Sequence, residues 1–255
     1  MIKNVKAYQG YVSYSMKKFP FLERFNLKSY YDKSAPLVVF GCYGSGNVSI
    51  ILNHKDIVII RWCGADSRKK YVTKLIKPNI IHVAILPNIQ RHLKSKGINC
   101  HQIKATTREK PHPMILKDKV YTYLNKNAPQ YHGSEIVKIL NIKYKILIGD
   151  YSIPQKNWYA GRCDEYYSQA FIGLSLSNYA GGAGSIIEMG LRGIKVVTNL
   201  LDMPHTIPWK TIKDIEQSIE KESKNIGKTN IKLAEQVYNS MNHDPDCFDL
   251  DKLLI

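Results

Sequence analysis

The stretch FIGLSLSNYAGGAGSIIEMGLRGIKVVTN, residues 171–199, decides the fold of this chain. Its pattern predicts, in order, a buried strand, a glycine-rich loop, a helix and a second strand, over residues 171–177, 179–184, 185–192 and 195–198. Gly193 stands where a glycine commonly ends a helix. A strand, a helix and a strand at this spacing form a βαβ unit, which belongs to a parallel sheet with helices on its faces.

The same stretch suggests an anion site. Backbone N–H groups of the loop and of the helix start carry partial positive charge, so they suit a diphosphate. Glu188, one turn into the helix, could accept hydrogen bonds from a ribose diol. The pattern Ser185-Ile-Ile-Glu188 is also that of a capping box, in which both side chains only satisfy the helix end, and both interpretations stay open. The loop does not match GxGxxG, and the chain has no GxxxxGK[ST], which disfavours dinucleotide oxidoreductases and P-loop NTPases.

The alternation of strands and helices extends upstream. Predicted strands cover residues 37–40, 57–60, 80–85 and 98–103, and predicted helices cover residues 47–53, 67–76 and 88–96. The first 34 residues are rich in aromatic and basic side chains, and their pattern predicts a short extended piece followed by one or two helices.

A break in this rhythm divides the chain. Residues 105–118 hold Pro111 and Pro113 and form the best linker candidate. A second series of strands and helices follows, with its first strand over 119–123 and with closing helices near the C-terminus. The sequence therefore predicts an α/β protein of two Rossmann-like parallel-sheet halves facing a cleft, with domains over residues 1–110 and 111–255.

Composition limits the class of protein. The chain has 255 residues, of which 44% are hydrophobic and 23% charged, as expected for a globular protein with a buried core. There is no signal-peptide pattern and no apolar run of the roughly 18 residues that a membrane span needs. The five cysteines are scattered without a CxxC pair, which disfavours a disulfide framework and a zinc site. We expect a cytoplasmic protein without a bound metal or cofactor.

The charge is uneven along the chain. The formal net charge is +16, and the first 115 residues carry 20 basic and 5 acidic residues. This asymmetry suggests that the N-terminal half meets an anionic partner, although a solvated lysine-rich surface would look the same.

Several motifs carry a family resemblance. The stretch 171–199, together with FGCYGSG (40–46), NHKDIVIIRWCGADS (53–67) and KPNIIHVAILPNIQRHLKSKGI (77–98), resembles GT-B glycosyltransferases. VYTYLNKNAPQYHG (120–133) and TIPWKTIKDIEQSIEKE (206–222) resemble the opening strand and the closing helices of their donor domain. The resemblance covers roughly residues 36–240.

The resemblance implies a metal-independent transferase of hexosyl type. Such an enzyme uses a nucleoside diphosphate sugar, with the nucleotide held by the C-terminal half and a glycan or lipid-linked acceptor by the N-terminal half. Two departures stand out. Ala180 occupies the position where retaining families often carry a second Glu, so the stereochemistry stays open, and the N-terminal half looks abbreviated.

Site residues follow from the resemblance. In the C-terminal half, the donor site is expected to comprise Gly182, Ala183, Gly184, Ser185 and Glu188. Tyr123 is expected to stack on the base, and Lys156 and Arg162 to balance the charge of the diphosphate. The turn Gly44, Ser45 and Gly46 is expected to approach the donor from the other half. Asp66 follows a strand in the loop WCGAD, which makes it the candidate general base for an inverting reaction.

Two other functions stay open. The basic half is compatible with a nucleic-acid-binding protein, although no helix-turn-helix, RRM, KH or zinc signature is present and nucleic acid is not the expected partner. The short N-terminal half is compatible with a catalytically inactive interaction module. If the protein is a transferase, its basic half also suits peripheral contact with an anionic membrane.

Overall fold

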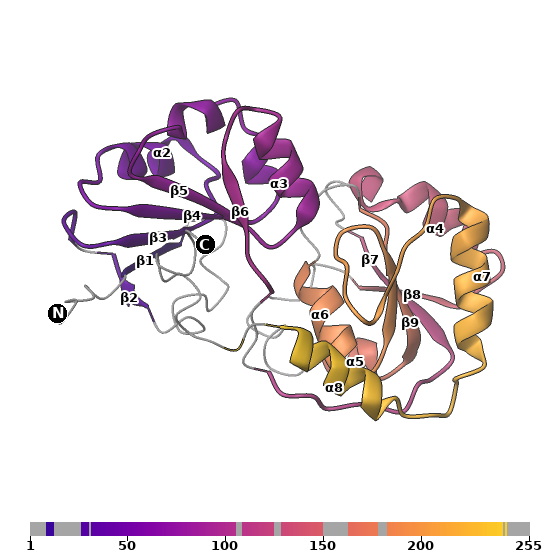
Figure 1. The fold of residues 1–255 in the computed structure, drawn as a ribbon. Coiled ribbons are helices and arrows are strands. Elements are labelled where there is room, and N and C mark those ends of the chain that lie inside the picture. The colour runs from indigo at the N-terminus through magenta and orange to yellow at the C-terminus, as the bar shows by residue number, and fades with distance from the viewer. Residues whose placement is uncertain are drawn as a thin grey trace. The chain divides into compact units, whose positions relative to one another are not determined.

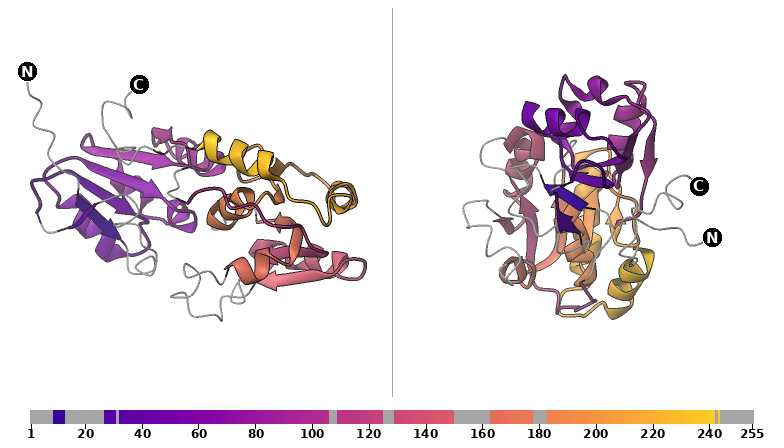
Figure 2. Two further views of the ribbon diagram at one scale, coloured as in Figure 1. Left: turned by 90° about the horizontal axis from the view of Figure 1, so that it is seen from below. Right: turned by 90° about the vertical axis from the view of Figure 1, so that its left-hand side faces the viewer.

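The computed structural model describes residues 9–12, 27–30, 32–105, 109–124, 129–149, 163–177, 183–241 and 243. The chain divides into two compact units, of which unit 1 comprises Met1–Arg108 with Asn242–Ile255 and unit 2 comprises Glu109–Met241. Within the described residues each unit holds one sheet whose strands all pair in parallel (Figures 1 and 2). The predicted α/β class with two parallel sheets is confirmed.

The sheet of unit 1 has six strands in the order β2-β1-β3-β4-β5-β6. Their bounds are β1 Gln9–Val12, β2 Lys28–Ser29, β3 Leu37–Phe40, β4 Val58–Trp62, β5 Ile80–Ala84 and β6 Cys100–Gln102. Strands β3 and β4 form the centre because their side chains are apolar on both faces. Every residue of β3, and Val58, Ile59 and Ile60 of β4, is fully buried, as expected for a strand of a parallel sheet covered on both sides.

The connections from β3 to β6 cover one face of this sheet. They contain α2 (Ser45–Leu52), the 3-10 helices η2 (Ala65–Arg68) and η3 (Val72–Leu75), and α3 (Pro87–Lys94). All three connections step along the sheet in the same direction, so right-handed crossovers place them on the same side. Figure 1 shows α2 and α3 beside strands β4 to β6.

The sheet of unit 2 has five strands in the order β11-β10-β9-β7-β8. Their bounds are β7 Lys119–Tyr123, β8 Ile146–Gly149, β9 Ala170–Ser175, β10 Lys195–Thr198 and β11 Thr206–Ile207. Strand β9 lies at the centre, where Ala170, Ile172 and Leu174 are buried. The predicted βαβ unit of residues 171–199 is therefore confirmed as β9, a helix and β10.

Helices cover both faces of the second sheet (Figure 1). They are η4 Pro129–His132, α4 Ser134–Leu140, α5 Cys163–Tyr167, α6 Ala183–Leu191, α7 Ile212–Ser223 and α8 Ile231–Ser240. Helix α6 packs on α8 and α7 packs on β9. Gly193 follows α6 at φ +77°, a left-handed conformation that terminates the helix as the sequence predicts.

Three details differ from the sequence expectation. Residues 67–76 form parts of η2 and η3 instead of one basic helix. Strands β1 and β2 extend the first sheet from a segment where one short extended piece and helices were expected, and residues 13–26 of that segment lie outside the described residues. Strand β11 has only two residues and was not predicted.

Candidate functional site

The strand order of unit 2 places a topological switch point between β7 and β9. From β7 the chain moves outward to β8, and it then returns to β9 on the other side of β7 before continuing to β10. In open parallel sheets, ligands bind outside the carboxyl ends of the strands at such a point, because the connections diverge there. Those carboxyl ends are Tyr123 in β7 and Ser175 in β9.

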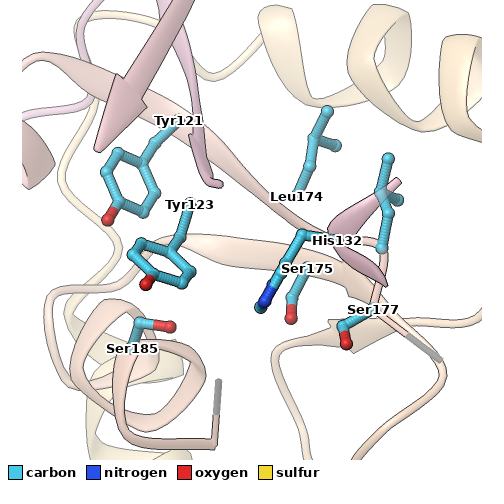
Figure 3. Close-up of a pocket in the computed structure, with 8 residues that line it drawn as sticks. Tyr121, Tyr123, His132, Leu174, Ser175, Ser177 and Ser185 are labelled. Carbon is cyan, nitrogen blue, oxygen red and sulfur yellow. The ribbon is translucent and has the colours of Figure 1, made fainter. Parts of the chain in front are cut away.

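A pocket occupies this position (Figure 3). It is lined by Tyr121, Tyr123, His132, Leu174, Ser175, Leu176, Ser177 and Ser185. Its empty volume is about 270 Å³ with open solvent included. Most of that volume is open solvent, so the pocket is a small depression at the switch point.

Two aromatic rings form one wall of the pocket. The ring centroids of Tyr123 and His132 lie 5.3 Å apart at an interplanar angle of 89°, an edge-to-face contact. Burial lowers the pKa of His132 below its ordinary value, so the ring is neutral at pH 7. A neutral imidazole offers one hydrogen-bond donor and one acceptor to a ligand.

Gly133 brings His132 against the end of β9. Its φ is +75°, and a Cβ there would lie 2.8 Å from Cβ of Leu176. Only a glycine permits both this backbone conformation and this approach. The position of η4 against the end of β9 therefore requires a glycine at residue 133.

Helix α6 begins beside the pocket. Ser185 is the third residue of α6 and lines the pocket, so it stands inside the helix and not at its N-cap. These bounds do not place Ser185 at the N-cap that the capping-box interpretation requires. The half-buried carboxylate of Glu188 accepts instead a hydrogen bond of 2.9 Å from the hydroxyl of Tyr167 in α5.

Tyr167 is held from both sides. Its side chain is 1% exposed, and its ring packs edge-to-face on Tyr121 with centroids 5.1 Å apart. The guanidinium of Arg192 lies 5.2 Å from the centroid of the same ring. Because Tyr121 lines the pocket, Tyr167 links the pocket wall to Glu188.

Arg192 fixes the end of α6 through two carboxylates. Its Nε donates to Asp164 at 2.5 Å, its Nη2 to Glu109 at 3.0 Å and its Nη1 to the carbonyl of Glu188 at 2.8 Å. The side chain is buried, and buried charges are tolerated in proteins when they are paired in this way. Arg192 is thus committed to internal partners, and its charge is not available to a ligand.

The structure brings together part of the predicted donor site. Tyr123 and Ser185 line the pocket, Gly184 is exposed in the first turn of α6, and Glu188 lies one turn further along. The backbone of Ala183 starts α6. Lys156, Arg162 and Gly182 lie outside the described residues.

The glycine turn of unit 1 follows β3, at the switch point between β1 and β3. The backbone N–H groups of Tyr43 and Gly44 are bound by the side chain of Asn47 in α2. Asn47 Oδ1 accepts from the N–H of Tyr43 at 3.1 Å and from that of Gly44 at 3.0 Å. Ser45 and Gly46 are exposed at the start of α2.

Asp66 fastens this turn to the loop after β4. Its carboxylate accepts from the backbone N–H of Cys42 at 3.1 Å, of Cys63 at 3.2 Å and of Gly64 at 2.7 Å. The residue is 0% exposed, and burial raises the pKa of Asp66 although these hydrogen bonds oppose the rise. The contacts are those of a residue that holds two loops together, and a role as general base stays a prediction.

Sequence reasoning missed four residues of the unit 2 site. Ser175 and Ser177 end a predicted strand, so the rule that ligands bind at carboxyl ends could have identified them. His132 and Tyr167 had no such signal, because their contacts with Tyr123 and Glu188 follow no strand or helix period.

Within the described residues, no group of three or more His, Cys, Asp or Glu side chains could hold a metal ion. No helix among them is both long and apolar enough to span a bilayer.

Comparisons with known proteins identify solved structures of similar fold. No protein-family model and no curated protein matches the sequence. Among solved structures, TarM, a glycosyltransferase of GT-B type, matches with a TM-score of 0.54 at 14% identity, over 88% of this chain and 55% of TarM. An S. aureus TarM mutant in complex with fondaparinux, α-GlcNAc-glycerol and UDP matches with a TM-score of 0.50 at 14% identity, over 85% of this chain and 52% of that one.

This chain therefore spans about half the length of TarM. At this identity the similarity shows the fold alone, which is the α/β fold with two parallel sheets that a GT-B glycosyltransferase has.

Proposed function

We propose that this protein is a glycosyltransferase that moves a sugar from a nucleoside diphosphate sugar to a glycan or lipid-linked acceptor. The observation that carries the proposal is the pocket of unit 2, which lies at the switch point of a parallel sheet beside the first turn of α6. The fold shared with TarM supports it, and UDP and α-GlcNAc-glycerol in one of the matching complexes give the expected ligand chemistry.

In this proposal the nucleotide binds to unit 2. Glu188 accepts hydrogen bonds from the ribose hydroxyls, for which Tyr167 holds one of its oxygens in place. The base enters the pocket against Tyr123, where ring stacking stabilises it. The N–H groups of Gly184 and Ser185 in the first turn of α6 face the diphosphate, whose negative charge they stabilise together with Lys156 and Arg162.

The transfer exchanges one bond for another. An acceptor hydroxyl oxygen forms a bond to the anomeric carbon, and the bond from that carbon to the diphosphate oxygen breaks. The electron pair leaves with the nucleoside diphosphate, and the acceptor proton passes to a base. We propose that the N-terminal half supplies the acceptor site, that no metal ion is required, and that Asp66 is the first residue to test as the base.

Release of the nucleoside diphosphate tests this function. The protein is incubated with UDP-, GDP- and dTDP-sugars, each with and without glycan or lipid-linked acceptors, and the released nucleoside diphosphate is measured. We expect release from one donor class, stimulated by an acceptor. Binding without any release or transfer would favour an inactive interaction module.

A further inference from the structure

A strongly basic face lies on unit 1. Residues 67–105 contain nine lysines and arginines and no aspartate or glutamate. Eight of these side chains, all exposed, define what we call the basic face: Arg68, Lys69, Lys70, Lys74, Lys77, Arg91, Lys94 and Lys96.

The basic face is continuous because its elements share one side of the sheet. η2, η3 and α3 belong to successive connections of the same direction, and α3 packs against η2. Figure 1 shows α3 beside β5 and β6 on this side. The pKa of His92 in α3 gives independent evidence that α3 lies close to Arg68 in η2. Burial lowers the pKa of His92, and the positive charges of Arg68 and Lys96 lower it further.

The six lysines of the basic face have no carboxylate partner among the described residues. The ion pairs that join described residues all lie in unit 2, between Glu109 and Glu222. Lys77 donates only to the carbonyl of Leu52, at 3.4 Å. The charge of these six lysines is therefore left for an external anion.

The composition of the face favours a lipid surface over a nucleic acid. Single-stranded nucleic acids stack on exposed aromatic rings. The one tyrosine among residues 67–105, Tyr71, is half-buried, and its hydroxyl donates to the carbonyl of Cys42 at 2.8 Å. Lysines predominate over arginines, and Ile76 is 52% exposed between Lys74 and Lys77. An apolar side chain among lysines suits the boundary between headgroups and acyl chains.

We propose that the basic face docks unit 1 on an anionic phospholipid membrane, with the lysine ammonium groups among the lipid phosphates and Ile76 at the headgroup boundary. This goes beyond the proposed transferase activity, because it involves neither the pocket nor Glu188. Each lysine near an anionic surface strengthens binding about fivefold, and the attraction falls off within a Debye length of about 8 Å at physiological salt.

Vesicle co-sedimentation tests the proposal. The full chain is mixed with phosphatidylcholine vesicles that contain or lack phosphatidylglycerol, at low and at physiological salt. The test variant combines Lys69→Gln, Lys70→Gln and Lys74→Gln. The control variant combines Lys213→Gln, Lys221→Gln and Lys232→Gln, three exposed lysines of α7 and α8 in unit 2, and it removes the same net charge.

We expect salt-sensitive binding to the anionic vesicles, weakened on the order of 100-fold in the test variant and little changed in the control. Absence of binding, or equal loss in both variants, would overturn the proposal. Tighter binding to RNA or DNA than to vesicles, lost in the same test variant, would also overturn it and assign the face to nucleic acid. Thermal shift with sugar nucleotides is measured on the same samples, so failure of the membrane proposal is distinguished from failure of the transferase proposal.

Discussion

The hydroxyl of Tyr167 donates a hydrogen bond of 2.9 Å to Oε2 of Glu188, across 21 residues of sequence. The tyrosine stands in α5 and the glutamate in α6. Since the ring of Tyr167 is buried between Tyr121 and Arg192, the hydroxyl has little freedom to move. Tyr167 is therefore a positioning residue for the carboxylate that we assign to the ribose.

Tyr167→Phe should remove this hydrogen bond and leave the packed ring. We expect the Kd for the nucleotide to rise on the order of 10-fold, because a hydrogen bond to a charged group contributes at least about 1.5 kcal/mol. The KM for the donor should rise with little change in kcat. Tyr166→Phe is the control, since Tyr166 contacts Tyr121 only through its ring. A fall in kcat alone would show that Tyr167 acts on the chemical step instead.

Asp66→Asn should destabilise unit 1. The amide nitrogen cannot accept hydrogen bonds, so at least one of the buried N–H groups of Cys42, Cys63 and Gly64 loses its acceptor. The expected loss is about 1–3 kcal/mol of unfolding free energy, measured by urea denaturation. A variant that keeps its stability and loses turnover would identify Asp66 as a general base and refute a purely structural role.

Acid should destabilise the protein through two buried histidines. Burial lowers the pKa of His82 and that of His205 to about 4. Nδ1 of His82 accepts from the indole of Trp62 at 3.1 Å, so its protonation would replace an acceptor with a second donor. The unfolded chain takes up these protons near pH 6.5, so the stabilisation is complete above that pH and is lost as the pH falls toward 4.

Between pH 7 and pH 5, each of these histidines should lower the free energy of unfolding by about 2 kcal/mol. Urea denaturation at the two pH values measures this, and His205→Gln should reduce the pH dependence. An unchanged slope in that variant would mean that His205 does not contribute.

Much of the fold could be predicted because its signals are local. The apolar run Leu37-Val-Val-Phe40 and the stretch 171–199 form the strands expected from their composition, and Gly193 ends α6. The single helix predicted over residues 67–76 does not form, because tertiary contacts determine the conformation of these residues. The Ser67 hydroxyl donates to the carbonyl of Gly64 at 2.6 Å, beside the buried Asp66, which favours the tight turn of a 3-10 helix over a continuous α-helix.

A short extended piece was expected near the N-terminus, but the pairing of strand β1 with β3 was not predicted, for a similar reason. Gln9 is a buried polar residue in a strand, and its side-chain amide donates to the carbonyls of Asp32 and Ala35. A short strand with a polar buried residue has no apolar pattern that would mark it. Its partners stand more than 20 residues away in the sequence, beyond the reach of periodicity.

The residues of the candidate site likewise fall into those that local patterns predict and those that tertiary contacts determine. Ser185 and Glu188 follow from the glycine-rich loop and the helix start, which are local patterns. The contact of Tyr123 with His132 follows no strand or helix period, and that of Tyr167 with Glu188 joins two helices that are 21 residues apart in the sequence at these positions. The sequence therefore identifies the helix that carries the site and cannot identify the residues that hold it in place.

The central claim is that the pocket of unit 2 binds a nucleoside diphosphate sugar through Glu188. Isothermal titration of UDP-, GDP- and dTDP-sugars into the full chain tests it most directly, with Glu188→Ala as the test variant and Glu235→Ala, exposed on α8, as the control. We predict binding of at least one donor class, weakened by about 1–3 kcal/mol in Glu188→Ala and unchanged in Glu235→Ala. Binding of no sugar nucleotide, or equal affinity in wild type and Glu188→Ala, would contradict the claim.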